Sequence, residues 1–295
     1  MPCRCSFLLL YCLLLIPLGQ LQAVEAIDDS GNRVELDRPA RRIVSLSPHA
    51  TEMLFAAGGG GRLVGAVDYS DFPPEARKVP QIGGYHDFDL ERVVAMRPDL
   101  VVAWSSGNGV RRIEELRRLG LKLFVTEPAS LEMIARDIAA LGVLAGSESV
   151  AKASADSLLR RRDTLDRTYR QRPPVPVFYQ IWNSPLMTLN GDHLISRVIE
   201  LCGGRNVFSQ LPSLTPTISP EGVLAADPEV ILAGGMNDER PEWLDDWRRW
   251  PSLSAVQRNN LFHINPDLLQ RNGPRIIEGA ERLCALLEQA RGRRP

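Results

Sequence analysis

A segment that occurs twice constrains the fold of this chain most strongly. Residues 90–104 read LERVVAMRPDLVVAW, and residues 220–234 read PEGVLAADPEVILAG. They align without a gap, and each places a glutamate, Glu91 or Glu221, at the start of a short helical pattern that precedes an apolar strand. We therefore predict one structural unit used twice. Two equivalent acids on two lobes also suggest docking onto a basic partner with two-fold symmetry.

The rest of the chain predicts an α/β fold, because strand-like apolar runs alternate with helical patterns in both halves. Its 295 residues, 44% of them hydrophobic, suffice for two domains, and a net charge of −1 argues against a nucleic-acid partner. We predict two Rossmann-like αβ lobes with mostly parallel sheets, joined by one long rigid α-helix. The predicted bounds are a signal peptide at 1–23, lobes at 24–146 and 173–295, and the connecting helix at 147–172.

The connecting helix is predicted from composition. Residues 147–172 are mostly polar, contain no Gly or Pro, and end at Pro173-Pro174. A helix of this length between two αβ halves acts as a rigid spacer. The alternative is an ordinary surface helix of one domain.

The N-terminus has the pattern of an export signal. Arg4 precedes an apolar run at 7–18, and small residues at Ala23 and Ala26 fit cleavage after LQA or VEA. The alternative is an uncleaved membrane anchor. Export would leave two cysteines, Cys202 and Cys284, in an oxidising compartment, where they form either a disulfide or two buried free thiols.

Enzyme signatures are absent from the sequence. It contains no G-x-S-x-G, no P-loop and no complete G-x-G-x-x-G motif, and its four histidines are scattered. We therefore predict no catalytic residues, no metal site and no cofactor. A secreted hydrolase stays as a remote alternative, because a catalytic triad can escape sequence patterns.

Aromatic and polar residues at the ends of predicted strands form the candidate ligand site. In open αβ sheets, ligands bind beyond the carboxyl ends of the strands, and flat rings there suit a large planar or macrocyclic ligand. The alternative for each ring is partial packing into the core. The candidates are Tyr69, Tyr85, Trp104, Trp182, Asp267, Leu268, Leu269, Gln270 and Arg271.

The two repeated glutamates also have a simpler interpretation. Asp89 and Ser219 are typical N-cap residues, and a carboxylate in the first turn is stabilised by the helix dipole. That role would account for each glutamate separately. It accounts less well for the same acid at the same point of both copies.

Several segments together resemble the cobalamin-binding periplasmic proteins of ABC importers. The resemblance covers nearly the whole chain after the signal, and its segments are RIVSLSPHATEMLFAAGG, DYSDFPPEARKVPQIGG, FDLERVVAMRPDLVVAW, ELCGGRNVF, ISPEGVLAADPEVI and GPRIIEGAERLC. Members of this class have two αβ lobes joined by one rigid helix. The resemblance implies a periplasmic monomer that captures cobalamin or a related corrinoid between its lobes. It would deliver this ligand to a dimeric transmembrane permease with a cytoplasmic ATPase.

The resemblance also implies roles for individual residues. Glu91 and Glu221 match the glutamates that engage arginine pockets of the permease, and Cys202 and Cys284 match a disulfide. Tyr69 matches a tyrosine on the corrin, Trp104 matches a cleft tryptophan, and residues 267–271 match a binding loop.

Three departures and one alternative concern the ligand. Tyr85, Thr215 and Leu268 stand where the cobalamin binders carry tryptophan. Relatives of the same class carry haem, for which Tyr69 or His86 would be the axial ligand. Others carry iron-siderophores, for which Arg271 would be a cleft cation.

Overall fold

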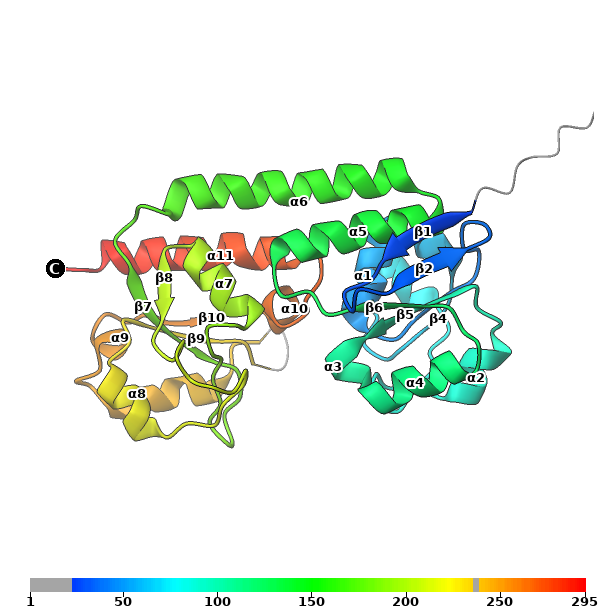
Figure 1. Cartoon of the computed structure of the whole chain (residues 1–295). Helices are drawn as coiled ribbons and strands as arrows, with labels where there is room; N and C mark the ends of the chain where they lie inside the picture. The colour runs from blue at the N-terminus through cyan, green and yellow to red at the C-terminus, as the bar shows by residue number, and fades with distance from the viewer. Residues whose placement is uncertain (1–22, 236–238) are drawn as a thin grey trace, which may run out of the picture.

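The computed structural model describes residues 23–235 and 239–295 (Figure 1). The predicted signal peptide, apart from its last residue, lies outside the described residues. Within these residues, no helix combines the length and the apolar character that crossing a membrane requires.

The N-terminal half contains a hairpin, a parallel sheet and the helices around it. A two-stranded antiparallel hairpin precedes a four-stranded parallel sheet in the order β4-β3-β5-β6. The elements are β1 (Val24–Ile27), β2 (Arg33–Leu36), β3 (Ile43–Ser45), α1 (Pro48–Ala56), β4 (Leu63–Ala66), α2 (Leu90–Ala95), β5 (Leu100–Trp104), α3 (Ser105–Asn108), α4 (Val110–Arg118), β6 (Leu123–Thr126) and α5 (Leu131–Ala145).

The C-terminal half repeats this design. Its parallel sheet has the spatial order β8-β7-β9-β10. In both sheets, the second strand in chain order therefore lies at one edge, followed in space by the first, third and fourth strands. The elements are β7 (Val175–Gln180), α7 (Leu194–Leu201), β8 (Gly204–Asn206), α8 (Pro220–Ala226), β9 (Val230–Ala233), η3 (Glu242–Arg249), α9 (Ser254–Gln257), β10 (Leu261–His263), α10 (Pro266–Leu269) and α11 (Ile276–Gly292). The repeated segments form α2–β5 and α8–β9, at equivalent places in the two sheets. The predicted α/β fold of two lobes is confirmed.

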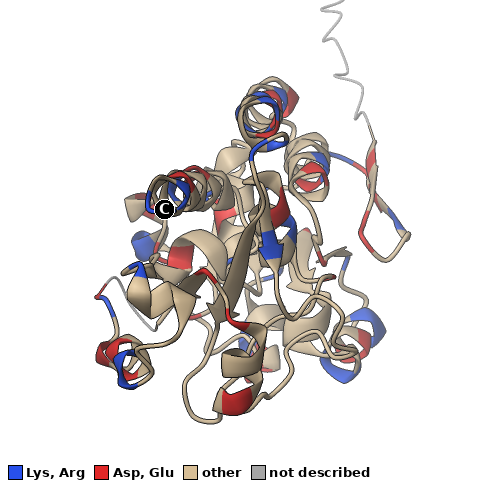
Figure 2. Cartoon of the chain, turned by 90° about the vertical axis from the view of Figure 1, so that its left-hand side faces the viewer, with Lys and Arg blue, Asp and Glu red and all other residues tan. Residues whose placement is uncertain are grey.

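Helix α6 (Glu148–Tyr169) joins the two halves and packs on both. It contacts α1 and α5 in the first half and α7 and α11 in the second. Its buried residues are Ala151, Ala155, Leu158 and Leu165, and they belong to one hydrophobic core that includes side chains of both halves. Seen end-on in Figure 2, α6 lies above α5 and α11, and all three ribbons carry positions of Lys, Arg, Asp and Glu. This is the packing expected of a connector rather than of a surface helix of one domain.

Both ends of helix α5 carry ordinary sequence signals. The Ser130 side chain caps it by accepting a hydrogen bond from the Met133 amide, and Gly146 ends it in the left-handed conformation. Gly142 permits the close crossing with α6, because a Cβ atom there would lie 2.1 Å from the Cβ atom of Ala151.

The two cysteines that follow the predicted signal peptide form a disulfide. Cys202 follows α7, Cys284 lies in α11, their Sγ atoms are bonded, and both residues are fully buried. The disulfide prediction is confirmed, and the alternative of two free thiols is wrong. The bond fixes two helices of the C-terminal half to one another.

Candidate functional site

Two loops at the carboxyl ends of strands meet between the lobes. One follows β4 and carries Tyr69, Ser70 and Asp71. The other begins in α10 and ends at Arg275, at the start of α11. The Nη1 atom of Arg271 lies 2.8 Å from Asp71 Oδ1, so an ion pair connects the C-terminal lobe to the N-terminal lobe at this point.

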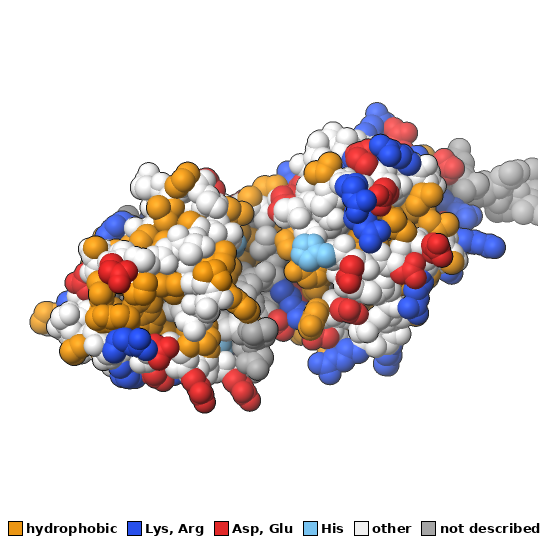
Figure 3. All heavy atoms as spheres, turned by 90° about the horizontal axis from the view of Figure 1, so that it is seen from below, with side chains coloured by type: hydrophobic (Ala, Val, Ile, Leu, Met, Phe, Trp, Pro, Cys, Tyr) orange, Lys and Arg blue, Asp and Glu red, His pale blue; other side chains and the backbone are white. Residues whose placement is uncertain are grey.

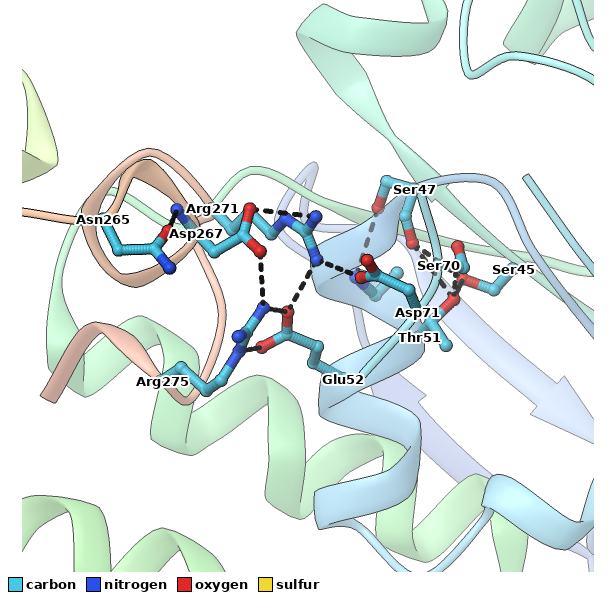
Figure 4. A network of polar contacts seen from close by, with 11 residues as sticks. Ser45, Ser47, Thr51, Glu52, Ser70, Asp71, Asn265, Asp267, Arg271 and Arg275 are labelled. Atoms are coloured by element: carbon cyan, nitrogen blue, oxygen red, sulfur yellow. Dashed lines mark hydrogen bonds and ion pairs between the residues drawn. The ribbon is translucent and has the colours of Figure 1, made fainter. Parts of the chain in front are cut away.

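A buried ion pair forms the centre of this junction (Figure 4). Arg275 donates to both carboxylate oxygens of Glu52, at 3.0 Å from Nε and 2.7 Å from Nη2. The Glu52 side chain is only 2% exposed, and the Arg275 guanidinium also stacks on the Phe72 ring, 4.1 Å from its centroid. A bidentate ion pair of this kind fixes both the distance between the two side chains and their relative orientation.

A second guanidinium extends the junction. Besides Asp71, Arg271 contacts Glu52 Oε1 at 3.5 Å and Asp267 Oδ1 at 2.9 Å. The five members of this ionic junction are Glu52, Asp71, Asp267, Arg271 and Arg275. Of its carboxylates, Glu52 is buried, whereas Asp71 and Asp267 keep 43% and 34% of their side-chain surface exposed.

Hydroxyl groups hold the Asp71 loop against α1. The Thr51 Oγ1 atom lies 2.9 Å from Ser45 Oγ and 3.1 Å from Ser70 Oγ, and these side chains are buried (Figure 4). Because Thr51 precedes Glu52 in α1, the same helix turn positions the loop and supplies the central carboxylate.

Burial and neighbouring charges shift the pKa values at the junction in different directions. Burial raises the pKa of Glu52 even though both arginines oppose it. Burial would also raise the pKa of Asp71, but the Arg271 guanidinium outweighs it and lowers that pKa. Burial, followed by the charge of Arg271, lowers the pKa of His49 to about 3, so this ring is neutral at any ordinary pH.

Aromatic rings gather beside the junction on the N-terminal lobe. The Trp104 ring centroid lies 5.5 Å from that of Tyr85 and 5.1 Å from that of the buried His49, and Tyr85 lies 4.2 Å from His86. The Nε1 atom of Trp104 donates to Glu127 at 3.3 Å. The structure therefore brings together two predicted ligand-binding rings, Tyr85 and Trp104.

The other two predicted rings are more isolated. Tyr69 is 71% exposed and has a φ of 62°, which is rare for a residue with a side chain. Trp182 follows β7, is partly exposed, and donates from its indole nitrogen to the Ser184 carbonyl. Both rings are presented by loops and neither is packed into the core.

The residues of the predicted C-terminal binding loop lie in different environments. Asp267 and Arg271 belong to the ionic junction, and Gln270 lies 3.3 Å from the buried Tyr179 hydroxyl. Leu268 and Leu269 are buried in the core, so they support the loop from beneath. Thr215, expected from the resemblance to occupy a tryptophan position, is half-buried.

A cavity of about 820 Å³ lies beneath α6, where α1, the Phe72–Pro73 turn and the start of α11 come together. None of the predicted ligand-binding residues lines it. Glu52 and Arg275 border it, whereas Arg271, Asp71 and Asp267 do not. The ion pair therefore stands between this cavity and the side on which the two exposed carboxylates lie. Figure 3 shows a furrow between the lobes from below.

The predicted docking glutamates occupy matching places. Glu91 and Glu221 lie in the first turns of α2 and α8, both are exposed, and neither makes an ion pair within residues 23–235 and 239–295. Both helices lie along the lower edge in Figure 1. The caps that we expected are present: Asp89 accepts from the Arg92 amide, and Ser219 from the Gly222 amide.

Sequence reasoning missed three members of the ionic junction, Glu52, Asp71 and Arg275. One signal was visible, because Glu52 is a lone acid inside the apolar helix segment ATEMLFAA. A charge on the core side of a helix needs a partner. The identity of that partner, 223 residues further along the chain, could not be read from local patterns.

Comparison with known proteins places this geometry in context. The profile of the family described as "Periplasmic binding protein" matches residues 43–268. A protein of Photorhabdus laumondii named vitamin B12-binding protein is 38% identical over 246 residues, covering 83% of this chain and 87% of the relative. A relative of the same name from Vibrio cholerae is 35% identical and covers 85% of this chain and 91% of the relative.

A solved structure agrees with these sequence relatives. The crystal structure of the periplasmic vitamin B12-binding protein of Vibrio cholerae superposes with a TM-score of 0.79 at 35% identity, covering 86% of this chain and 98% of that one. The profile and the relatives describe solute binding in transport rather than catalysis, which confirms the prediction of a non-enzyme. This chain belongs to the periplasmic binding protein family.

Proposed function

We propose that this protein is a periplasmic receptor that binds cobalamin or a related corrinoid between two lobes, 24–146 and 173–295, spaced by the connector 147–172. The observation that carries the proposal is similarity, at 35–38% identity and over more than four fifths of the chain, to proteins named for vitamin B12 binding. Such relatives share one fold along their whole length, so the ligand site is expected at the same place.

The geometry between the lobes supports a large, flat, amide-rich ligand. The aromatic rings of Tyr85 and Trp104 lie next to each other, and the Tyr69 ring is exposed on the loop that follows β4. Stacking on these rings would bury the apolar face of a corrin, and polar side chains of residues 267–271 would orient its edge. We propose these rings, Trp182 and the loop as the ligand contacts.

Delivery to a permease is the second part of the proposal. Glu91 and Glu221 are exposed, lack ion pairs within the described part of the chain, and belong to α2 and α8, which both lie along the lower edge of Figure 1. A dimeric permease, coupled to a cytoplasmic ATPase, would offer two arginine-lined sockets to them. We expect a monomer that is exported by residues 1–23, and the Cys202–Cys284 disulfide fits an oxidising compartment.

Titration with cyanocobalamin tests the ligand. Isothermal calorimetry of the purified mature protein should give a saturable one-to-one heat, with a change in the visible corrin spectrum. Absence of both signals at micromolar protein would reject the proposal.

Haemin serves as the competing ligand. A Soret band that forms on mixing and is lost in Tyr69→Ala would favour the haem alternative instead. The solved periplasmic haem-binding protein of Roseiflexus is 22% identical to this chain, a level that supports the shared fold alone.

A further inference from the structure

The ionic junction contains more negative than positive groups. Two guanidinium groups, Arg271 and Arg275, face three carboxylates, those of Glu52, Asp71 and Asp267. With all five ionised, one negative charge is in excess. Protonation of Glu52 would bring the sum to zero, so the junction presents no net positive charge in either state.

The nearest titratable ring does not alter this balance. His49 is fully buried and its low pKa keeps it neutral, so it contributes no positive charge beside Arg271. On the neighbouring aromatic group, Glu127 contributes another carboxylate, which accepts from Trp104 and from Ser106. Together, the ionic junction and Glu127 therefore carry a net negative charge whether or not Glu52 is protonated.

Asp71 has a particular place in this arrangement. It comes from the opposite lobe to Arg271, contacts the same nitrogen, Nη1, that also faces Glu52, and stays partly exposed. Arg271 itself is 15% exposed and is engaged by three carboxylates. Its charge is thus satisfied within the protein and is not left for a ligand.

Ligands of this class of receptor differ in charge at their edges. The edge of a corrin carries neutral amides, which donate and accept hydrogen bonds, whereas haem carries two carboxylates and ferric siderophores are commonly anionic. An amide can donate to the exposed oxygens of Asp71 and Asp267. A carboxylate in the same position would face like charges, which is costly at an interface.

We propose that Asp71, by neutralising Arg271 across the lobes, determines specificity for amide-edged ligands and against carboxylate-edged ones. The inference rests on the proposed function, because it assumes that the ligand lies against the exposed side of the junction. It assigns a selective role to a residue of the N-terminal lobe that contacts the C-terminal loop directly.

The test uses probes that differ by one functional group. Cyanocobalamin is compared with its separated monocarboxylates, in each of which one propionamide is hydrolysed to a carboxylate. We expect the wild-type protein to bind at least one monocarboxylate roughly tenfold or more weakly than cyanocobalamin, a difference of ~1.4 kcal/mol. This penalty should shrink as salt is raised from about 0.05 to 0.5 M, because exposed charges are screened.

Two variants test whether Asp71 causes the weaker binding of the monocarboxylate. In Asp71→Asn the ratio of the two affinities should fall to about a third of the wild-type ratio or less. Glu75→Gln removes one exposed negative charge a few residues away and should keep the wild-type ratio. If Asp71→Asn does not fold, Asp71→Ser is used instead, because it removes the same carboxylate and leaves Arg271 on Glu52 and Asp267.

The outcomes separate the two proposals. Equal binding of cyanocobalamin and all monocarboxylates by the wild-type protein overturns the charge selection and leaves the corrinoid proposal intact. An unchanged ratio in the folded variant likewise overturns the role of the carboxylate. No binding of any corrinoid, with tight binding of haemin, overturns both.

Discussion

Two buried carboxylates face each other where the N-terminal hairpin meets α5. Asp29, from the turn of the hairpin, accepts from the Glu127 amide and pairs with Arg136. Asp137 in α5 is fully buried, and its Oδ2 atom has no hydrogen-bond partner among the residues that the structure describes. Burial, together with the charge of Asp29, raises the pKa of Asp137 to about 8.

This raised pKa predicts a pH-dependent stability. Between pH ~4, where an unfolded aspartate loses its proton, and pH about 8, the folded protein keeps a proton that the unfolded chain has released. The free energy of unfolding should therefore fall as pH rises through this window. Asp137→Asn mimics the protonated acid, so we expect it to raise the melting temperature at pH 8 by ~2–6 °C and to change little at pH 4.5.

Calorimetric melting at the two pH values checks this prediction. Asp37→Asn is the control, because Asp37 is exposed and makes no ion pair within the described ranges. It should give the same small effect at both pH values. An equal shift of Asp137→Asn at pH 4.5 and pH 8 would show that the carboxyl proton is not involved.

At the scale of the elements, the repeated segments predict most of the architecture. Each copy joins a capped helix to an apolar strand, and a strand that follows a helix in this way belongs to a parallel sheet. The structure shows both copies at equivalent places, with the same strand order in the two lobes. The prediction succeeded because cap residues and strand patterning act over a few residues and are therefore visible in sequence.

The contacts between the lobes were much less predictable. Asp71 and Arg275 look like ordinary surface charges in sequence. Glu52 stands out as a lone acid in an apolar helix, but its sequence context does not identify its partner. The paired residues are 200 and 223 positions apart. The sequence also indicates which rings lie near strand ends, yet it gives no sign that Trp104 packs on His49 rather than standing free. Pairing of this kind depends on the relative placement of two sheets, which no local pattern specifies.

The disulfide between α7 and α11 supports a prediction at this scale. Its cysteines are 82 residues apart, so removing the bond frees a long loop in the unfolded state. Cys202→Ala combined with Cys284→Ala should lower the free energy of unfolding by ~2–5 kcal/mol in a urea titration. Because both residues belong to the C-terminal lobe and the aromatic group of Tyr85 and Trp104 to the N-terminal lobe, ligand affinity should remain near that of the wild type.

Reduction provides the control. Unfolding the wild-type protein in dithiothreitol should lower its urea midpoint toward that of the double variant, whose own midpoint should not move. A variant as stable as the oxidised wild type would mean that packing of α7 on α11 alone holds this part of the lobe.

At the scale of the molecule, the lobes are held in a fixed relation. The hydrophobic core continues from one half through α6 into the other, and the ion pair of Glu52 and Arg275 also joins the lobes. Only small movements between the lobes are expected from such a connection. The distance between α2 and α8 is then a property of the resting protein and does not depend on ligand closure.

This rigidity would make the proposed docking a two-point event, which can be tested by removing both glutamates. We predict that Glu91→Ala combined with Glu221→Ala lowers cobalamin uptake in cells by more than roughly tenfold, since truncating one partner of an interface charge pair is costly. Affinity of the purified variant for cobalamin should be unchanged, because neither acid contacts the ionic junction or the aromatic group.

The matched control removes two acids from the opposite side. Glu148→Ala combined with Asp156→Ala changes the net charge equally, but both residues lie on α6, at the upper edge of Figure 1 where α2 and α8 lie at the lower edge. Uptake should be normal in this control if position matters and charge alone does not. Normal uptake in the Glu91 and Glu221 variant would instead mean that the two carboxylates only stabilise the first turns of their helices, which is their simpler role.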